Sequence, residues 1–381
     1  MIYLDHAATT PIRGEVMEAM VPFLTEEYGN ASSIYGLGRG ARSAVDKARH
    51  SVAQFFGCAD SEIVFTSGGT ESIHSALLGA WLARPDRKHI ITTAVEHHAV
   101  LHTCDLLHEM GLEVTILDVD ENGRVSVEDV IGAIRGDTLC VSVMMVNNEL
   151  GSVNQVAAIA EAVHRASPDV LVHSDMVQAA GVFRLELDRS GVDLASMTAH
   201  KLGGPKGIGA LYIRRGTQWK SVLRGGAQER ERRAGTENTA AIVGFGAAVD
   251  WLSRHFEEHT EAIRVRSQAL REGLSKISAI TWNSPPDGVP HILNVRFHGI
   301  RADRLLMRLD LEGVAASAGS ACAAGSLTPS HVLLAIGLDP KAARESVRFS
   351  LSDEMTEEEI SQALEIIERT VSQLQSTTRP S

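Results

Sequence analysis

The feature that most constrains the fold is an alternation of short apolar runs with amphipathic stretches between about residues 40 and 215. Residues 41–55 place apolar side chains at helical spacing, and the run at residues 63–66 is typical of a buried strand. Further strand-like runs follow at residues 90–92, 114–117, 139–146 and 170–173. This repeated strand–helix order predicts an α/β fold, with a mostly parallel sheet covered by helices on both faces.

The chain has 381 residues, which is long for one domain, and its pattern changes after about residue 250. Residues 251–277 predict a long helix, and a proline-rich turn and a strand come after it. Residues 356–373 predict an acidic amphipathic helix. We therefore expect a large domain of residues 15–256 and a smaller α+β domain formed by residues 1–14 and 257–381.

Charge and composition exclude several classes of protein. The 36 Lys and Arg stand against 48 Asp and Glu, and the net charge of −12 argues against a protein that coats nucleic acid. No apolar stretch approaches the ~18 residues of a membrane span, and the N-terminus lacks the pattern of a secretory signal. The four cysteines form no CxxC pair, which is typical of reduced thiols. We expect a cytoplasmic protein that contacts neither membrane nor nucleic acid directly.

Chemically distinctive residues follow several predicted strands, and ligands bind at the carboxyl ends of parallel strands. The glycine-rich turn at residues 67–71, which includes Gly69 and Thr70, suits a phosphate at a helix N-terminus. A tight turn with Thr70 as N-cap explains it equally well. Asp175 follows the strand at residues 170–173 and suits a cationic ring nitrogen, although a helix cap is the commoner role of a lone Asp.

Two further residues have the chemistry of covalent catalysis. Lys201 ends an apolar strand in a glycine-rich bed, where a partly buried amine can form a Schiff base with an aldehyde. Taken alone, the segment is more typical of an ordinary surface lysine in a glycine-rich loop. Cys322 lies among small residues that offer little packing, unlike Cys104 and Cys140 in apolar segments. An accessible thiol of this kind can act as a nucleophile, and we favour a chemical role for Cys322.

His97 and Arg348 complete the set of candidates. His97 suits stacking on an aromatic cofactor or proton transfer, although many such histidines only begin a helix. Arg348 lies in an apolar strand, where either a carboxylate ligand or an internal ion pair would offset the cost of burial. A phosphate site, an aldehyde-binding lysine, a ring-nitrogen acid and a carboxylate site are together what pyridoxal 5'-phosphate (PLP) chemistry on an amino acid requires.

The motifs resemble those of the cysteine desulfurases of the NifS/IscS type, within the class V aminotransferase group of fold-type I PLP enzymes. The resemblance extends from residues 3–10 to residues 348–351. It implies a seven-stranded type of sheet flanked by helices, a PLP cofactor and no metal. It also implies an enzyme that converts L-cysteine to L-alanine.

The resemblance assigns roles to individual residues. It implies that Lys201 forms the Schiff base, that Asp175 pairs with the ring nitrogen, and that His97 stacks on the ring and transfers protons. It further implies that Gln178 pairs with the phenolic oxygen. Asn148 and Arg348 are implied to contact the substrate carboxylate, Asn148 also the cofactor. The residues implied to hold the phosphate are Gly69, Thr70, Thr198 and His200.

Sulfur transfer and assembly are also implied by the resemblance. The Cys322 thiolate attacks the substrate sulfur and carries it as a persulfide for an acceptor or scaffold protein. A homodimer is implied, in which Thr236 of the motif at residues 233–238 contributes to the partner subunit's phosphate site. Iron–sulfur cluster assembly, tRNA thiolation, cofactor biosynthesis and DNA phosphorothioation are all open destinations for the sulfur.

The chain departs from the family pattern at three places. Ile73-His74 replaces a common pair of Asn, and Ala318 and Ala323 replace frequent Ser and Thr near Cys322. Ser352-Asp353 stands where Gly-Arg is common. Three other functions stay open at this point: a selenocysteine lyase, another class V enzyme in which Cys322 is incidental, and a sulfur-relay subunit with an inactive site.

Overall fold

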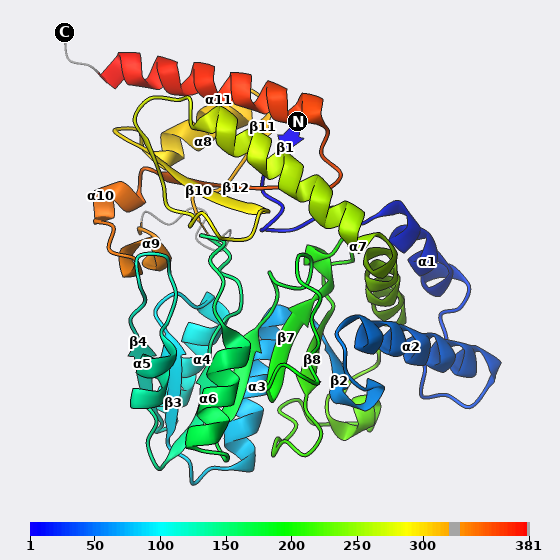
Figure 1. Cartoon of the computed structure of the whole chain (residues 1–381). Coiled ribbons are helices and arrows are strands. Elements are labelled where there is room, and N and C mark those ends of the chain that lie inside the picture. The colour runs from blue at the N-terminus through cyan, green and yellow to red at the C-terminus, as the bar shows by residue number, and fades with distance from the viewer. Residues whose placement is uncertain (320–327, 379–381) are drawn as a thin grey trace.

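The structure is a computed structural model of the whole chain, and it describes residues 1–319 and 328–378. Figure 1 shows a large sheet with its helices in one half of the molecule and a small sheet with helices α8 and α11 in the other. Within the described residues, no helix is both long and apolar enough to cross a membrane.

A seven-stranded sheet forms the centre of the larger half, in the order β2-β8-β7-β6-β5-β3-β4. β8 runs antiparallel to both its neighbours, and all other pairings are parallel. The predicted, mostly parallel sheet is therefore confirmed. Its strands are β2 (Ile63–Thr66), β3 (His89–Thr93), β4 (Glu113–Leu117), β5 (Thr138–Ser142), β6 (Leu171–Asp175), β7 (Leu194–Thr198) and β8 (Gly209–Ile213).

Helices cover both faces of this sheet, because successive side chains of a strand point to opposite sides. Ile63 and Phe65 of β2 join an apolar core with α2, α6 and α7, whereas Val64 joins a second core with α3 and α4. The helices before α7 are α1 (Gly14–Thr25), α2 (Gly36–Phe55), α3 (Gly69–Ala83), α4 (His98–Glu109), α5 (Val127–Gly132) and α6 (Val156–Ala166). Short 3₁₀ helices are η1 (Asp60–Glu62), η2 (Ala199–Lys201) and η3 (Gln228–Glu231).

The smaller half contains a three-stranded antiparallel sheet in the order β12-β10-β9. A parallel pair, β1 with β11, brings the N-terminus beside it, and Leu4 packs in the same apolar core as α8 and α11. The strands are β1 (Ile2–Tyr3), β9 (Ile280–Trp282), β10 (Ile292–Phe297), β11 (Val314–Ala315) and β12 (Ser346–Ser350). The helices are α8 (Ala302–Leu311), α9 (His331–Ala335), α10 (Pro340–Ala343) and α11 (Glu357–Thr378).

The 36-residue helix α7 (Thr239–Leu274) connects the two halves. It begins at Thr239 rather than at the predicted residue 251, because the Asn238 side chain accepts a hydrogen bond from the Ala241 backbone N–H and caps it there. A single non-helical residue, His255, bends the helix. Its first part packs on α1 and α2, and α11 packs along the helix as well.

Candidate active site

A cavity of about 210 Å³ lies at the carboxyl ends of β6 and β7, the edge at which α/β sheets bind ligands. Residues from segments far apart in the sequence meet here, including Arg348 of the small sheet. Ten of the residues predicted from the sequence line it: Gly69, Thr70, His97, Asn148, Asp175, Gln178, Thr198, His200, Lys201 and Arg348. Ile73, one of the departures from the family pattern, also lines the cavity and is buried.

Lys201 ends η2, directly after β7, and this position brings its side chain to the cavity. Its Nζ donates hydrogen bonds to the carbonyl oxygens of Ala7 and Ala8, the latter at 2.5 Å. The Gln178 amide donates to the same Ala7 carbonyl at 2.9 Å. The N-terminal segment therefore supplies backbone acceptors to the lysine. Backbone carbonyls leave no signal in residue types, so the role of Ala7 and Ala8 could not be predicted from the sequence.

Asp175 ends β6 as a buried carboxylate. Burial raises its pKa to about 6, although a 2.9 Å hydrogen bond from the Val177 backbone N–H lowers the pKa in part. The residues after Asp175 form turns and no helix, so the helix cap considered as an alternative is absent, and the bond stabilises a turn beside the cavity. A cation beside this carboxylate would favour its ionised form.

Glu96 is a second buried carboxyl group, which was not among the residues predicted from the sequence. Its Oε1 accepts hydrogen bonds from Thr93 Oγ1 at 2.9 Å and from the Met144 backbone N–H at 2.8 Å. Its Oε2 has no hydrogen-bond partner in the described part of the chain. Burial raises the pKa of Glu96 to about 8, so the group is mostly protonated at pH 7.

Two imidazoles at the cavity are neutral at pH 7. Burial, followed by the charge of Lys201, lowers the pKa of His97 and of His200 to about 4. His97 also begins α4, since its Nδ1 accepts a 3.1 Å hydrogen bond from the Ala99 backbone N–H. The helix-start role is therefore present beside the cavity position. A neutral imidazole can accept a proton or stack on an aromatic ring.

The N-terminus of α3 faces the cavity through Gly69 and Thr70. The N-cap of the helix is Gly68, so the interpretation of Thr70 as the N-cap is wrong. Gly209 of β8 passes so close that a Cβ on it would lie 2.7 Å from the Gly68 carbonyl carbon. The free backbone N–H groups of the first helical turn are suited to hold an anion such as a phosphate.

Arg348 lies on β12 with only 1% of its surface exposed. Its terminal nitrogens donate to the Asn148 carbonyl at 2.7 Å and to Asp5 Oδ1 at 2.6 Å. The internal ion pair considered as an alternative is therefore present, with Asp5 as its partner. The Nε of Arg348 is buried and has no hydrogen-bond partner among residues 1–319 and 328–378. Because Arg348 lines the cavity, this nitrogen is a candidate donor for a carboxylate bound there.

One predicted site residue in the described part of the chain, Thr236, is not among those that line the cavity. Thr236 is exposed on the loop before α7. Cys322 lies outside the described residues. The other three cysteines are free, and burial raises the pKa of Cys58 and Cys104 to about 12 and that of Cys140 further. These three thiols are therefore poor nucleophiles at neutral pH.

Described residues before and after the segment at residues 320–327 contact the surroundings of the cavity. Ser317 exchanges two backbone hydrogen bonds with Arg348. Ser330 Oγ donates to Glu149 Oε2 at 2.6 Å, and the His331 ring lies 2.9 Å from the Glu96 carbonyl oxygen.

The donor set of the cavity fits PLP. Lys201 offers an amine for the aldehyde, Asp175 a buried carboxylate for the ring nitrogen, and the first turn of α3 a set of N–H groups for the phosphate. The orphaned Nε of Arg348 adds a donor for an amino-acid carboxylate. The fold and this site define a PLP-dependent class V aminotransferase, and the family model described as Aminotransferase class-V matches residues 2–363. The chain belongs to this family.

Relatives within the family narrow the activity. The cysteine desulfurase IscS of Dictyoglomus turgidum is 43% identical over 376 residues, which cover 98% of this chain and 95% of the relative. A solved NifS-like protein superimposes with a TM-score of 0.92 at 36% identity, covering 97% of this chain and 99% of that one. The structure of SspA in complex with cysteine has a TM-score of 0.84 at 34% identity and covers 93% and 100% of the two chains. The present chain is a PLP-dependent cysteine desulfurase of the IscS/NifS type. Among the functions left open by the sequence, the relatives thus favour desulfuration.

Proposed function

We propose that this desulfurase transfers the sulfur of L-cysteine to Cys322, which carries it as a persulfide. One observation carries the proposal. The three described cysteines are thiols with raised pKa. By contrast, the chain before residue 320 bonds the cavity residue Arg348, and the chain after residue 327 contacts Glu96, the sequence neighbour of the cavity residue His97. The relative that was solved with cysteine bound supports L-cysteine as the substrate.

The bound cofactor supplies an aldehyde for the amino group and a ring that withdraws electrons from the α-carbon. In our proposal, Lys201 holds the aldehyde, Asp175 keeps the ring nitrogen protonated, and Gln178 donates to the phenolic oxygen. Neutral His97 stacks on the ring. The residues that we assign to the phosphate are Gly69, Thr70, Thr198 and His200.

The same cavity orients the substrate and moves its proton. Arg348 and Asn148 hold the carboxylate, and Lys201 transfers the α-proton with neutral His97 beside it. The Cys322 thiolate attacks the substrate sulfur, so that an S–S bond forms as the C–S bond breaks. The β-carbon gains a proton and leaves as part of alanine. L-cysteine and an enzyme thiol thus become L-alanine and an enzyme persulfide, with all atoms balanced.

We further propose a homodimer in which Thr236 contributes to the partner subunit's phosphate site. Thr236 is exposed in its own chain, and its neighbour Glu237 pairs with Arg42 of α2 at 2.7 Å. Large apolar side chains are also exposed on α1, on the loop after it and at the start of α2, which is typical of an interface between chains. These side chains are Met17, Val21, Leu24, Tyr28, Ile34, Tyr35 and Leu37.

We also propose the division into a large domain of residues 15–256 and a small domain of residues 1–14 and 257–381. Its support is that most apolar side chains around the small sheet form a core of their own, although Ile292 of β10 packs in a core of the large sheet. A cytoplasmic location and delivery of sulfur to an acceptor or scaffold protein, for example in iron–sulfur cluster assembly, complete the proposal. The acidic net charge of −12 favours a protein as the direct recipient.

The test of the sulfur step is alanine release from L-cysteine under reductant, with wild type and Cys322→Ala compared. We expect the variant to retain PLP absorbance and to form almost no alanine. In a parallel reaction without reductant, which would otherwise remove the outer sulfur, mass spectrometry should find about 32 Da, the mass of one sulfur atom, added to the Cys322 peptide of the wild type. Cys58→Ala is the matched control and should keep full activity. Equal alanine from wild type and Cys322→Ala would refute Cys322 as the acceptor.

A further inference from the structure

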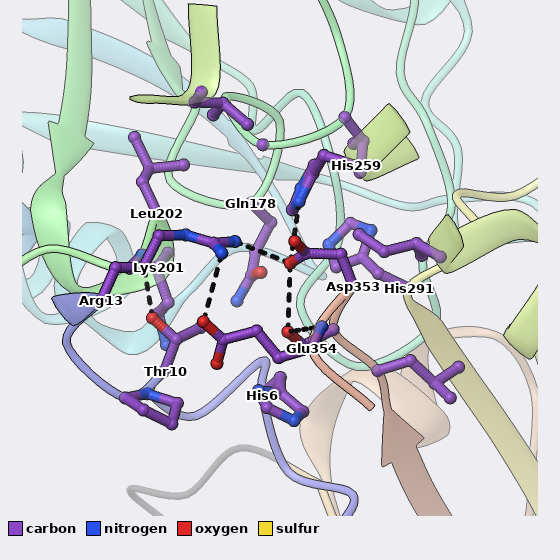
Figure 2. A pocket seen from close by; sticks show the side chains of 18 of the residues that line it. His6, Thr10, Arg13, Gln178, Lys201, Leu202, His259, His291, Asp353 and Glu354 are labelled. Atoms are coloured by element: carbon purple, nitrogen blue, oxygen red, sulfur yellow. Dashed lines mark hydrogen bonds and ion pairs between the residues drawn. The ribbon is translucent and has the colours of Figure 1, made fainter. Parts of the chain in front are cut away.

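We propose that the ion pair between Arg13 and Asp353 positions Lys201, and this inference rests on the cofactor-binding role proposed for that lysine. Neither Arg13 nor Asp353 lines the cofactor cavity. Both line a second cavity of about 50 Å³, which shares Val177, Gln178 and Lys201 with the first (Figure 2). Asp353 is also one of the departures from the family pattern, so the pair is a feature of this chain.

Hydrogen bonds join the N-terminal segment to the loop that carries Lys201. Thr10 Oγ1 donates to the His200 carbonyl at 2.9 Å and accepts from the Gly203 backbone N–H at 3.0 Å. The Arg13 backbone N–H donates to the Gly203 carbonyl at 3.0 Å. Since the carbonyls of Ala7 and Ala8 accept from Lys201 Nζ, the segment contacts the lysine loop on its backbone and on its amine.

The N-terminal segment runs from Asp5 to Arg13, and the Arg13 side chain holds its C-terminal end in place. It donates to Asp353 Oδ1 at 2.6 Å and to Glu354 at 3.1 Å, and its guanidinium lies 3.5 Å from the centre of the Trp251 ring. Figure 2 shows Asp353 between Arg13 and His259, whose Nδ1 is 2.9 Å away. Both side chains of the Arg13–Asp353 pair are only 11% exposed, so the surrounding protein weakens solvent screening.

Asp353 stays negatively charged over the neutral pH range. Burial alone would raise the pKa of this carboxyl, but the hydrogen bonds from His259 and then Arg13 outweigh it and hold the pKa well below its usual range. Asp353 is therefore ionised throughout the neutral range and attracts Arg13 at every pH at which the enzyme works.

A second ion pair holds the near end of the segment, between Asp5 and Arg348 at 2.6 Å. The stretch from Asp5 to Arg13 thus runs between two charges that lie on β12 and just after it. Its carbonyls at Ala7 and Ala8 face Lys201 Nζ between these two fixed ends. We infer that loosening the Arg13 end moves the two carbonyls away from the amine.

This arrangement has a chemical consequence. Carbonyl oxygens favour the ammonium form of Lys201, whereas only the neutral amine attacks an aldehyde. Other titratable or charged groups also face the lysine, and a substitution at position 353 leaves all of them in place. They are Asp175, His97, His200, His291 and Arg348.

The test follows the rate at which the cofactor-free chain takes up PLP, measured by absorbance from pH 6 to 10. In Asp353→Asn the midpoint of this pH profile should move to lower pH by about half a unit or more. The reason is that the ammonium form of Lys201 has lost the carbonyl acceptors that stabilise it. The matched control is Arg296→Gln, which breaks the largely buried pair with Glu345 near the small sheet and should leave the midpoint unchanged. Arg13→Lys keeps the charge and should give a smaller shift.

An unchanged midpoint in Asp353→Asn overturns the proposal. An equal shift of the midpoint in Arg296→Gln also overturns it, because that result would indicate a general loosening of the fold. Where Asp353→Asn fails to fold, Arg13→Gln carries the same measurement, since Asp353 then keeps His259 as its partner. Borohydride reduction of the wild type, followed by mass analysis of the Lys201 peptide, tests the lysine separately. An unmodified peptide refutes the proposed role of Lys201 whatever the Asp353 variant does.

Discussion

The Asn148 carbonyl accepts a 2.7 Å hydrogen bond from Arg348, although 200 residues separate the two in the sequence. Asn148 follows β5 of the large sheet and Arg348 lies on β12 of the small sheet. The bond therefore crosses from one half of the molecule to the other at the cavity. The proposed carboxylate site depends on how the two halves pack, and not on either sheet alone.

The first prediction concerns Arg348→Lys. Lysine cannot present the planar set of donors that pairs with a carboxylate and with the Asn148 carbonyl at once. We expect KM for L-cysteine to rise about 10- to 100-fold, the effect of losing one charge-assisted hydrogen bond. Steady-state kinetics measure it. Arg296→Lys on β10, paired with Glu345, is the control and should leave KM unchanged. An unaltered KM in Arg348→Lys would exclude the carboxylate role.

The parts of this site that the sequence predicted are those with a signal in side-chain chemistry and in strand order. Asp175 and Lys201 each follow a buried apolar run, and the carboxyl ends of neighbouring parallel strands must meet at one edge. The order of elements therefore predicted their meeting. Ion-pair partners are harder to predict from the sequence. No residue close to Arg348 in the sequence indicates that its partner is Asp5, which is 343 residues away.

Backbone contacts and backbone strain were beyond prediction from residue types. The carbonyls of Ala7 and Ala8 contact Lys201 although alanine has no polar side chain. Glu229 and Arg230 adopt positive φ angles of 49° and 56°, where glycine is the usual residue. Only tertiary contacts explain such a conformation, and these involve residues distant in the chain.

The second prediction is a pH effect of Glu96. Its pKa is raised from 4.5 to about 8, so between these values the folded chain holds a proton that the unfolded chain has lost. The stability that Glu96 contributes therefore falls as pH rises through this window, by on the order of 1 kcal/mol per pH unit. Glu96→Gln removes the titration. Urea unfolding of the cofactor-free chain should show that the free energy of unfolding of the variant rises relative to that of the wild type between pH 5 and pH 8. Parallel stability curves would contradict the raised pKa.

The third prediction tests the proposed dimer surface through Ile34, which is 90% exposed. A charge there costs the single chain little, but within an apolar interface it would be buried without a partner. Ile34→Asp should therefore give monomers by sedimentation and a reduced PLP content. The matched control is Leu311→Asp, which should sediment as wild type does. Leu311 lies on α8, outside the proposed dimer surface, and is 83% exposed. Identical sedimentation of both variants would remove this surface from the interface.

The fourth prediction concerns the buried pair of Arg49 and Glu229, whose side chains are 5% and 3% exposed. Arg49 donates to the Ile63 carbonyl at 3.0 Å, and Glu229 accepts from the Phe65 backbone N–H at 2.9 Å. β2 is an edge strand, so its outer backbone groups have no neighbouring strand to bond. The side chains of Arg49 and Glu229 therefore supply the missing hydrogen bonds to β2.

Arg49→Ala should lower the free energy of unfolding by about 3–5 kcal/mol, since it leaves a buried carboxylate without its partner. The comparison is Arg165→Ala, which breaks an i,i+4 pair on α6 whose side chains are 73% and 71% exposed. That change should cost below about 1 kcal/mol, because water screens exposed charges and solvates the partner that remains. Urea unfolding of the two variants separates these cases. Similar losses in both would mean that Glu229 finds another partner, and that β2 does not depend on Arg49.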